Sequence, residues 1–479
     1  MKLKTVKQLN VLKRFTFGLV LAVCISVFCA QAIAADESAQ AVDAAKSGES
    51  AKKEKGKLSI TKVAPDVTPV SDYSGDIWNR STMTGDWWGS RQNLYDHGVT
   101  FDASLTQIFQ GVVSGGPDGD DDDTMYNGLL DYGLTLDTGK LNWWPGGLLV
   151  ANAQTGFASN DPLEAGVISP PNFTSIYPTG EFPATELMEY YLMQPLSEKL
   201  TIIAGRINAV NFLDRNRFAN DPRNGFLNLS MNNDPLFGAF LFFSTYGAFG
   251  SWQVTENLTI NPAIWTPETE PGDYGGDWGS VGAGAEVDYS WKPGNDLGGV
   301  LRGTFLYSSA DPIALDNPRL VPELVRGQPL DTKPDNWIVA LNFEQYLWKP
   351  AASARKESTA RTAAFDFQEP GLGLFARASY TPDDRNAWNV YASGGISGRG
   401  IIPGRIYDRL GLGVYWLKES NDLDDQPGNL FQDEVGFEAF YNLAVTPWAQ
   451  LTFDVQWIDP GVTTIDDTVV LGTRLFTAF

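Results

Sequence analysis

Apolar and polar residues alternate along most of the chain after about Val99, in segments of roughly ten residues with a period of two. Because successive side chains of an extended strand point to opposite faces, this period predicts strands with one apolar and one polar face. The clearest segment covers residues 281–291, and segments 409–416 and 434–443 repeat its pattern. In the first of these the apolar face carries Val281, Ala283, Ala285, Val287, Tyr289 and Trp291.

The number and length of these segments favour a membrane protein. Alternation alone also fits a soluble β-sandwich, such as a secreted β-rich lectin. The chain contains about 16 such segments, most of them near the 9 to 11 residues that a tilted strand needs to cross a bilayer. Aromatic residues at the segment ends suit the membrane interfaces: Trp143, Trp144, Trp291, Tyr346, Trp348, Trp448 and Trp457. We therefore predict an all-β fold, a transmembrane antiparallel β-barrel of about 16 strands with a short N-terminal periplasmic extension.

Short and long connections alternate along the chain, as in barrels with tight turns on one side of the membrane and long loops on the other. The short ones include 138–146, 195–199 and 446–447, and the long ones include 158–185, 209–235 and 309–335. Two connections depart from this rule. The connection at 349–370 is long where the alternation predicts a short turn, and the connection at 382–385 is short where it predicts a long loop. Either the strand count slips there or the barrel is locally irregular.

The first 74 residues have a different composition. Residues 1–34 have the form of a secretory signal peptide, with basic residues before an apolar run and a cleavage site at Ala32-Ile33-Ala34. Residues 35–74 contain few large apolar side chains, which predicts a flexible low-complexity periplasmic leader. Both cysteines, Cys24 and Cys29, lie in the signal, so the mature chain has neither a disulfide nor a thiolate metal site. The barrel domain is expected to span residues 75–479.

Charge and residue content exclude several classes of function. The chain has 35 basic and 58 acidic residues, a net charge of -23, which disfavours nucleic acid as a partner. His97 is the single histidine and precedes a glycine at a turn, so a structural role is expected and a His-based catalytic triad is disfavoured. Residues 120–123 are consecutive aspartates that lack the spacing of a calcium loop, which favours a solvated acidic loop. We expect no catalytic residues, no metal and no cofactor.

The final segment, residues 468–479, is amphipathic and ends on Phe479. A terminal aromatic residue of this kind resembles the signal that the barrel-assembly machinery recognises in outer-membrane proteins. We therefore expect contact with that machinery during biogenesis and with outer-membrane lipid afterwards.

Several motifs resemble those of the carbohydrate-selective porins of the OprB type. They are TGDWWGSR at 84–91, AGRINAVNFLDRNRFANDPRNGFLN at 204–228, SGRGIIPGRIYDRLGLGVYW at 397–416, and FEAFYNLAVTPWAQLTFDVQWIDPG at 437–461. The last, VVLGTRLFTAF, covers 469–479. The likeness extends over about residues 75–479, although this chain has two tryptophans in the first motif where the family has one. It implies a 16-stranded barrel in the Gram-negative outer membrane and passive passage of monosaccharides and small carbohydrates into the periplasm.

The same resemblance implies a constriction lined by arginines and acidic residues. Strand parity places one set on lumen-facing positions: Arg302, Arg377, Arg409, Arg474, Glu286, Glu434 and Glu438. A second set lies in or beside a loop long enough to fold inward: Arg206, Arg215, Arg217 and Arg223. The planar guanidinium donates five hydrogen bonds, which suits sugar hydroxyls, although such charges also pair with one another across a wide barrel. A general porin and a barrel-embedded hydrolase remain alternatives, and the preferred sugar and a monomeric or trimeric state remain open.

Overall fold

The structure is a computed structural model that describes residues 73–117, 124–158, 165–176, 183–241, 244–267, 278–293, 296–350, 369–426 and 430–479. The expected signal peptide, nearly all of the expected leader and the aspartates at 120–123 lie outside these residues.

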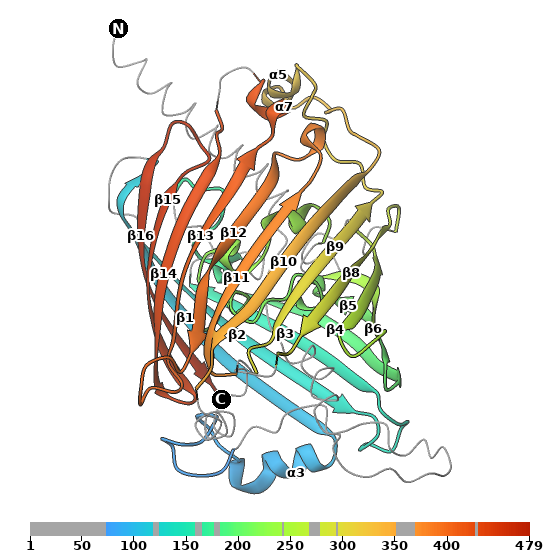
Figure 1. The fold of residues 1–479 in the computed structure, drawn as a ribbon, viewed down its shortest axis with the longest axis vertical. Helices are drawn as coiled ribbons and strands as arrows, with labels where there is room; N and C mark the ends of the chain where they lie inside the picture. The colour runs from blue at the N-terminus through green and yellow to red at the C-terminus, as the bar shows by residue number, and fades with distance from the viewer. Residues whose placement is uncertain are drawn as a thin grey trace.

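Within the described residues, sixteen strands form a closed antiparallel barrel in which each strand pairs with its neighbours in sequence and β1 pairs with β16 (Figure 1). This confirms the predicted fold and strand number. The strands are β1 (Val99–Gly116), β2 (Thr124–Asp137), β3 (Leu148–Ala158), β4 (Ala184–Ser197), β5 (Leu200–Ile207), β6 (Thr245–Gln253), β7 (Leu258–Trp265), β8 (Gly282–Trp291), β9 (Gly299–Ser308), β10 (Asn336–Trp348), β11 (Gly371–Tyr380), β12 (Trp388–Arg399), β13 (Arg409–Glu419), β14 (Glu434–Thr446), β15 (Ala449–Asp459) and β16 (Asp466–Ala478).

The helices are short and lie in the connections. They are η2 (Trp87–Gly89), α3 (Ser90–Asp96), η3 (Phe173–Ile176), η4 (Ala209–Asn211), α4 (Leu229–Asn232), η5 (Pro235–Ala239), α5 (Leu320–Val325), η6 (Asp383–Arg385) and α7 (Asn421–Asp424). None of the helices in the described part of the chain is long and apolar enough to cross a membrane.

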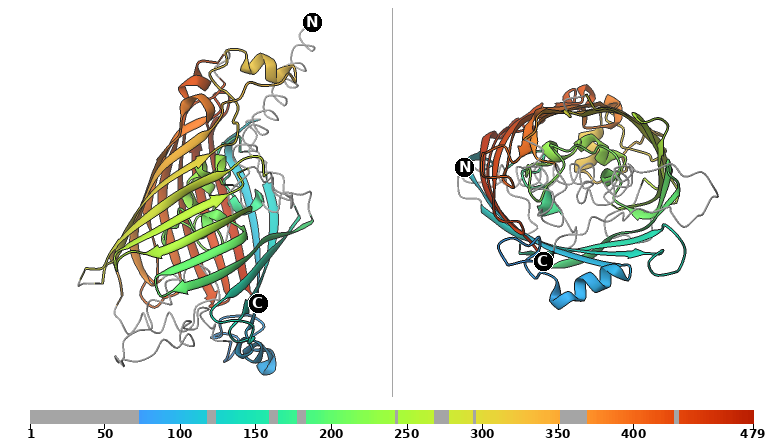
Figure 2. Two further views of the ribbon diagram at one scale, coloured as in Figure 1. Left: turned by 90° about the vertical axis from the view of Figure 1, so that its right-hand side faces the viewer. Right: turned by 60° about the horizontal axis from the view of Figure 1, so that its bottom comes forward.

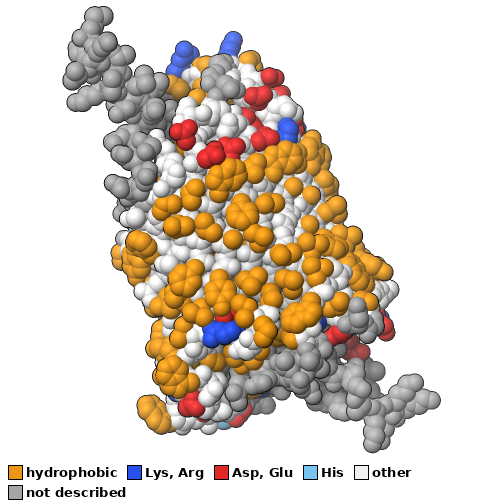
Figure 3. Space-filling model, turned by 60° about the vertical axis from the view of Figure 1, so that its left-hand side comes forward, with side chains coloured by type: hydrophobic (Ala, Val, Ile, Leu, Met, Phe, Trp, Pro, Cys, Tyr) orange, Lys and Arg blue, Asp and Glu red, His pale blue; other side chains and the backbone are white. Residues whose placement is uncertain are grey.

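The predicted faces of β8 are confirmed. On β8, Val287 and Tyr289 are 39% and 53% exposed on the outer face, whereas Glu286 is completely buried on the inner face. Figure 3 shows hydrophobic side chains over much of the outer wall, with acidic side chains gathered toward its two ends. An apolar outer band of this kind is what a lipid-facing barrel requires.

The two irregular connections are real features of the barrel, because the strands alternate in direction without a slip in the count. The 349–370 connection joins β10 to β11 at the end of the barrel where the C-terminus lies (Figure 1). The 381–387 connection joins β11 to β12 at the opposite end, where α5 and α7 lie (Figure 1). We call these two ends the terminus end and the loop end.

Residues 73–98 lie at the terminus end and hold the last residues of the chain. Arg91 Nη1 donates to the main-chain oxygen of Phe479 at 2.9 Å, and Arg91 Nη2 donates to Phe101 O at 2.9 Å. The amide of Met83 donates to Ala478 O at 2.8 Å. These contacts join the segment before β1 to the end of β16, so they cross the seam at which the barrel closes.

Candidate functional site: the loop inside the barrel

The connection between β5 and β6 runs through the interior of the barrel, as the view into the barrel shows (Figure 2, right). We call residues 208–241 the inner loop. Polar side chains at 208, 228 and 234 cap its three short helices: Asn208 accepts from Val210 N, Asn228 from Ser230 N and Asp234 from Leu236 N. Such caps satisfy amides that a short helix leaves unpaired. This stretch therefore folds inward, as its length allows.

Apolar side chains of the inner loop pack against the inner wall. The Phe226 ring lies 4.8 Å from that of Phe440 on β14 and 5.5 Å from that of Phe375 on β11. Phe218 lies over Gly373 of β11, where a side chain larger than hydrogen would collide with the ring. The lumen face is therefore apolar beneath the loop, because these side chains form a core inside the barrel.

Arg377 on β11 fixes the loop most directly. Its Nε donates to Asp214 Oδ1 at 2.9 Å, and its Nη2 donates to the carbonyl oxygens of Ala219 at 2.6 Å and Asn232 at 3.0 Å. The Arg377 side chain is 1% exposed. One guanidinium thus holds three separate parts of the loop, a use that its planar arrangement of donors permits.

Other predicted wall residues hold main-chain groups of the same loop. Arg474 on β16 donates to Pro222 O at 2.9 Å and Gly225 O at 2.6 Å. Glu438 on β14 accepts from Leu227 N at 2.5 Å. On β8, Glu286 accepts from Asp214 N at 2.9 Å. Both acids and Arg474 are fully buried.

Glu434 anchors a second connection, between β3 and β4. Its two carboxylate oxygens accept from the amides of Ile168 at 2.5 Å and Ser169 at 2.9 Å. Residues 165–176 in turn pack on the inner loop, where Phe173 N donates to Leu227 O at 2.9 Å. Two loops are therefore fastened together within the barrel.

The remaining predicted residues form ion pairs with different exposure. On the loop, Arg223 pairs with Asp131 of β2 at 2.7 Å, Arg215 with Asp288 of β8 at 3.5 Å, and Arg217 with Glu344 of β10 at 3.1 Å. On the wall, Arg302 pairs with Glu344 at 3.3 Å and Arg409 with loop residue Asp221 at 3.0 Å. Side-chain exposure is 46% for Arg217 and 23% for Arg215, but 8% or less for Arg223, Arg302 and Arg409.

Arg206 departs from the predicted pore-lining set. Its register partners are Tyr190 on β4 and Tyr246 on β6, whereas the inward face of β5 carries Ile203 and Ile207. Cross-strand partners point to the same face of a sheet, so Arg206 faces outward with the two tyrosines. Its Nε bonds to Ser244 Oγ, which ties the end of β5 to the start of β6. Apolar residues occupy both faces of β5, so the sequence pattern could not show which face of this strand points inward.

Two acids central to this arrangement were not singled out from the sequence. Glu344 shares the inward parity of Asn342 and Tyr346 on β10, so strand alternation could have identified it. Asp214 lies in the inner loop and accepts from Arg377, from Asn342 at 2.7 Å and from the amide of Asp234 at 2.9 Å. No local pattern marks Asp214, because its partners come from a distant strand and from another turn of the loop.

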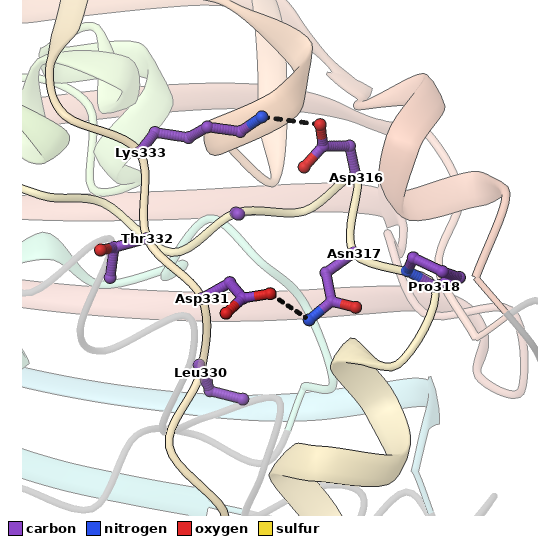
Figure 4. Close-up of a pocket in the computed structure, with 8 residues that line it drawn as sticks. Asp316, Asn317, Pro318, Leu330, Asp331, Thr332 and Lys333 are labelled. Carbon is purple, nitrogen blue, oxygen red and sulfur yellow. Dashed lines mark hydrogen bonds and ion pairs between the residues drawn. The ribbon is translucent and has the colours of Figure 1, made fainter.

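Three connections at the loop end are also joined to one another. Lys333 Nζ lies 2.6 Å from Asp316 Oδ2 in its own loop and 3.1 Å from Asp384 Oδ2 in the β11–β12 connection. Gln426, after α7, donates to Leu315 O at 2.8 Å. An open cavity of about 640 Å³ lies here (Figure 4), lined by Ala314, Asp316, Asn317, Pro318, Leu330, Asp331, Thr332 and Lys333. The loop end therefore carries a polar cavity within the β9–β10 connection, and that connection is braced by its neighbours.

Acid should loosen these connections at the loop end only well below neutral pH. Hydrogen bonds from Arg385 and Lys333 hold the pKa of Asp384 below its ordinary 3.8, and those with Asp316 and Asp384 raise the pKa of Lys333 above 10.5. The stability that Asp384 contributes is fully present above the pKa of its carboxyl in the unfolded chain, and it is lost as pH falls through the lower pKa of that carboxyl in the folded protein. The stability that Lys333 contributes is lost only in strong alkali. Hydrogen exchange of residues 309–335, corrected for intrinsic rates, should match at pH 5 and pH 8. Loss of protection between these two values would contradict the bracing.

His97 has the structural role expected of it. Its Nδ1 lies 2.7 Å from Asn93 O at the end of α3, and Gly98, with φ of 87°, makes the turn into β1. The role expected for Phe479 in assembly stays a prediction.

Comparison with known proteins agrees with this architecture. Residues 121–479 match the model of the family described as carbohydrate-selective porin, OprB family. Porin B of Pseudomonas aeruginosa strain PAO1 is 23% identical over 446 residues, which cover 84% of this chain and 92% of that protein. The high-pH structure of Pseudomonas putida OprB superposes with a TM-score of 0.70 at 21% identity, covering 85% of this chain and 100% of that one. Its low-pH structure gives a TM-score of 0.51 at 16% identity, with coverage of 84% and 99%. The chain belongs to the OprB family of carbohydrate-selective porins.

Proposed function

We propose that this outer-membrane channel admits sugars by passive diffusion past a constriction formed by the inner loop. The observation that carries the proposal is the anchoring of that loop from many sides of the barrel. It is held by residues of β2, β8, β10, β11, β13, β14 and β16. A constriction discriminates between solutes only if its groups keep fixed positions, and these anchors supply that rigidity.

The buried members of the predicted set act through the loop rather than on the solute. Arg377, Arg474, Glu286, Glu434 and Glu438 are each at most 3% exposed, so a permeating sugar does not reach them in this structure. We assign solute contact to the exposed ends of the ion pairs, Arg217 above all, followed by Arg215 and Asp221. Guanidinium and carboxylate groups close together can bond neighbouring sugar hydroxyls as donor and acceptor.

The charges around the inner loop come in opposite pairs. Arg217 faces Glu344, Arg215 faces Asp288, and Asp221 faces Arg409. Pairing limits the net field that an ion would experience, while it keeps hydrogen-bonding groups in place for a neutral polyhydroxylated solute. This supports sugar selectivity over a general porin.

Replacing Arg217 with glutamine should weaken sugar block of the channel by about three- to tenfold, the loss expected for one or two hydrogen bonds. The measurement is ion current through single channels in planar bilayers, titrated with glucose and short maltooligosaccharides. Arg326→Gln is the matched control, because Arg326 is an exposed arginine after α5 at the loop end. It should leave the block unchanged.

The outcomes separate the alternatives. Wild-type conductance without any sugar effect would overturn the selectivity and leave a general porin. Equal block in wild type and Arg217→Gln would keep the sugar channel but remove Arg217 from the constriction. Release of reducing sugar from oligosaccharides by the detergent-purified protein would instead support the hydrolase alternative.

A further inference from the structure

Two consecutive tryptophans at the terminus end adopt an unusual backbone conformation. Trp87 and Trp88 have φ values of 49° and 58°, in the left-handed region that bulky residues rarely adopt. Trp88 is fully exposed, and the nearby Trp78 is 68% exposed. A strained backbone that places a large apolar side chain in the open needs a compensating contact. Among the residues that the structure describes, none covers the ring of Trp78 or of Trp88.

Trp87 continues the lipid-facing surface of the barrel. Its ring centroid lies 6.3 Å from that of Phe101, which is 37% exposed at the beginning of β1. The register pairs Phe101 with Leu134, an outward residue of β2 that is 38% exposed. The η2 turn therefore lies against the outer side of the wall, at the level where the strands leave the membrane.

The adjoining helix is fastened to a second aromatic pair at the same level. Lys140, in the β2–β3 turn, places its ammonium 3.5 Å from the centroid of the Tyr95 ring of α3. The same turn carries Trp143 and Trp144, which stack with centroids 6.2 Å apart and are 55% and 40% exposed. Lys140 thus links the turn that carries the Trp143–Trp144 pair to α3, which contacts β1, and Figure 1 shows α3 at the terminus end, just beyond the ends of the strands.

We propose that residues 77–94 form an interfacial anchor, whose Trp88 side chain lies in the headgroup boundary of the phospholipid leaflet at the terminus end. Tryptophan favours this layer because its ring is apolar while its indole N–H remains hydrated. A lysine beside the aromatic pair suits lipid phosphates. Polar residues Gln92 and Asp96 of α3 are exposed and face the water. Short interfacial elements of this amphipathic kind lie in the membrane surface without crossing it.

The anchor is joined to the barrel by two hydrogen bonds. Trp448, in the β14–β15 turn, donates its indole N–H to Ile77 O at 2.6 Å, and Arg91 holds the end of β16. An interfacial segment fixed at both places keeps the closing seam at the membrane surface.

Spin labels at single cysteines test the anchor directly. The chain produced from residue 35, after the expected signal peptide, has no cysteine, so Trp88→Cys carries one nitroxide label and Gln92→Cys provides a matched control on α3. Each protein is reconstituted into phosphatidylethanolamine–phosphatidylglycerol vesicles, after heat-modifiable gel mobility has shown that it is folded. Power saturation then compares collision with oxygen, which concentrates in lipid, and with a water-soluble nickel chelate.

The label at 88 should collide severalfold more with oxygen than with nickel, a label at Trp143→Cys should behave in the same way, and the label at 92 should show the reverse. Equal nickel access at 88 and 92 would overturn the proposal. Low access of both reagents at 88 would also overturn it and would indicate cover by residues 35–72 instead.

Discussion

Replacing Arg377 with methionine should release the inner loop, raise single-channel conductance and weaken sugar block by more than about tenfold. The substitution removes the hydrogen bonds to Asp214, Ala219 and Asn232 together, and it leaves the Asp214 carboxylate buried without its cation. Breaking a buried ion pair from one side typically costs about 3–5 kcal/mol. Because that cost falls on the loop and not on the strand ladder, the barrel should still form while the loop becomes mobile.

Two further variants make this test specific. Arg377→Lys keeps the charge, but one ammonium cannot reach three separate acceptors, so it should give intermediate conductance and block. Arg405→Met removes an ion pair with Asp408 at 2.8 Å in the β12–β13 turn, where Arg405 is 41% exposed, and should change neither quantity. If Arg377→Met conducts and is blocked like the wild type, the loop does not depend on this anchor.

Strand alternation predicted the barrel and the inward position of Arg377, Arg474 and Glu438, because both properties depend on a local period of two. It could not predict what these side chains bind. Arg377 and Asp214 lie 163 residues apart, and Glu438 and the Leu227 amide lie 211 residues apart. In a barrel with an open lumen, a charged residue that faces inward contacts the solute. Where a loop fills the lumen, the same residue contacts the loop. The path of that loop follows from tertiary packing and not from any local pattern.

The same limit explains the apolar lumen and the position of Arg206. A polar inner face is expected where water fills a barrel, but Tyr191 and Phe249 face inward here because loop residue Phe212 packs on both. Ile203 of β5 joins this interior core, so the apolar residue faces inward and Arg206 faces outward. Reversal of the usual polarity therefore marks strands that are covered from inside, a distinction visible only once the loop has been placed.

Replacing Arg91 with methionine should lower the temperature at which the folded barrel unfolds in detergent by about 5 °C or more. Arg91 is 3% exposed, and its guanidinium bonds to the main-chain oxygens of Phe479 and Phe101 and pairs with Asp102 at 3.5 Å. It also lies over the ring of Tyr73, 4.2 Å from the centroid. Methionine fills similar volume without donors, so the seam between β1 and β16 loses its brace while the buried Asp102 carboxyl loses its cation.

The shift is measured as the midpoint of the change from folded to unfolded mobility on gels after heating. Arg80→Met is the matched control, because among the described residues Arg80 bonds only locally, to Thr82 O at 2.9 Å and to Met83 O. It should lower the midpoint by much less. Single-channel conductance below the transition should be unchanged in both variants, since neither residue contacts the inner loop. Equal midpoints for Arg91→Met and wild type would show that the β1–β16 hydrogen bonds close the barrel without this brace, and that residues 73–98 rest on the seam without stabilising it.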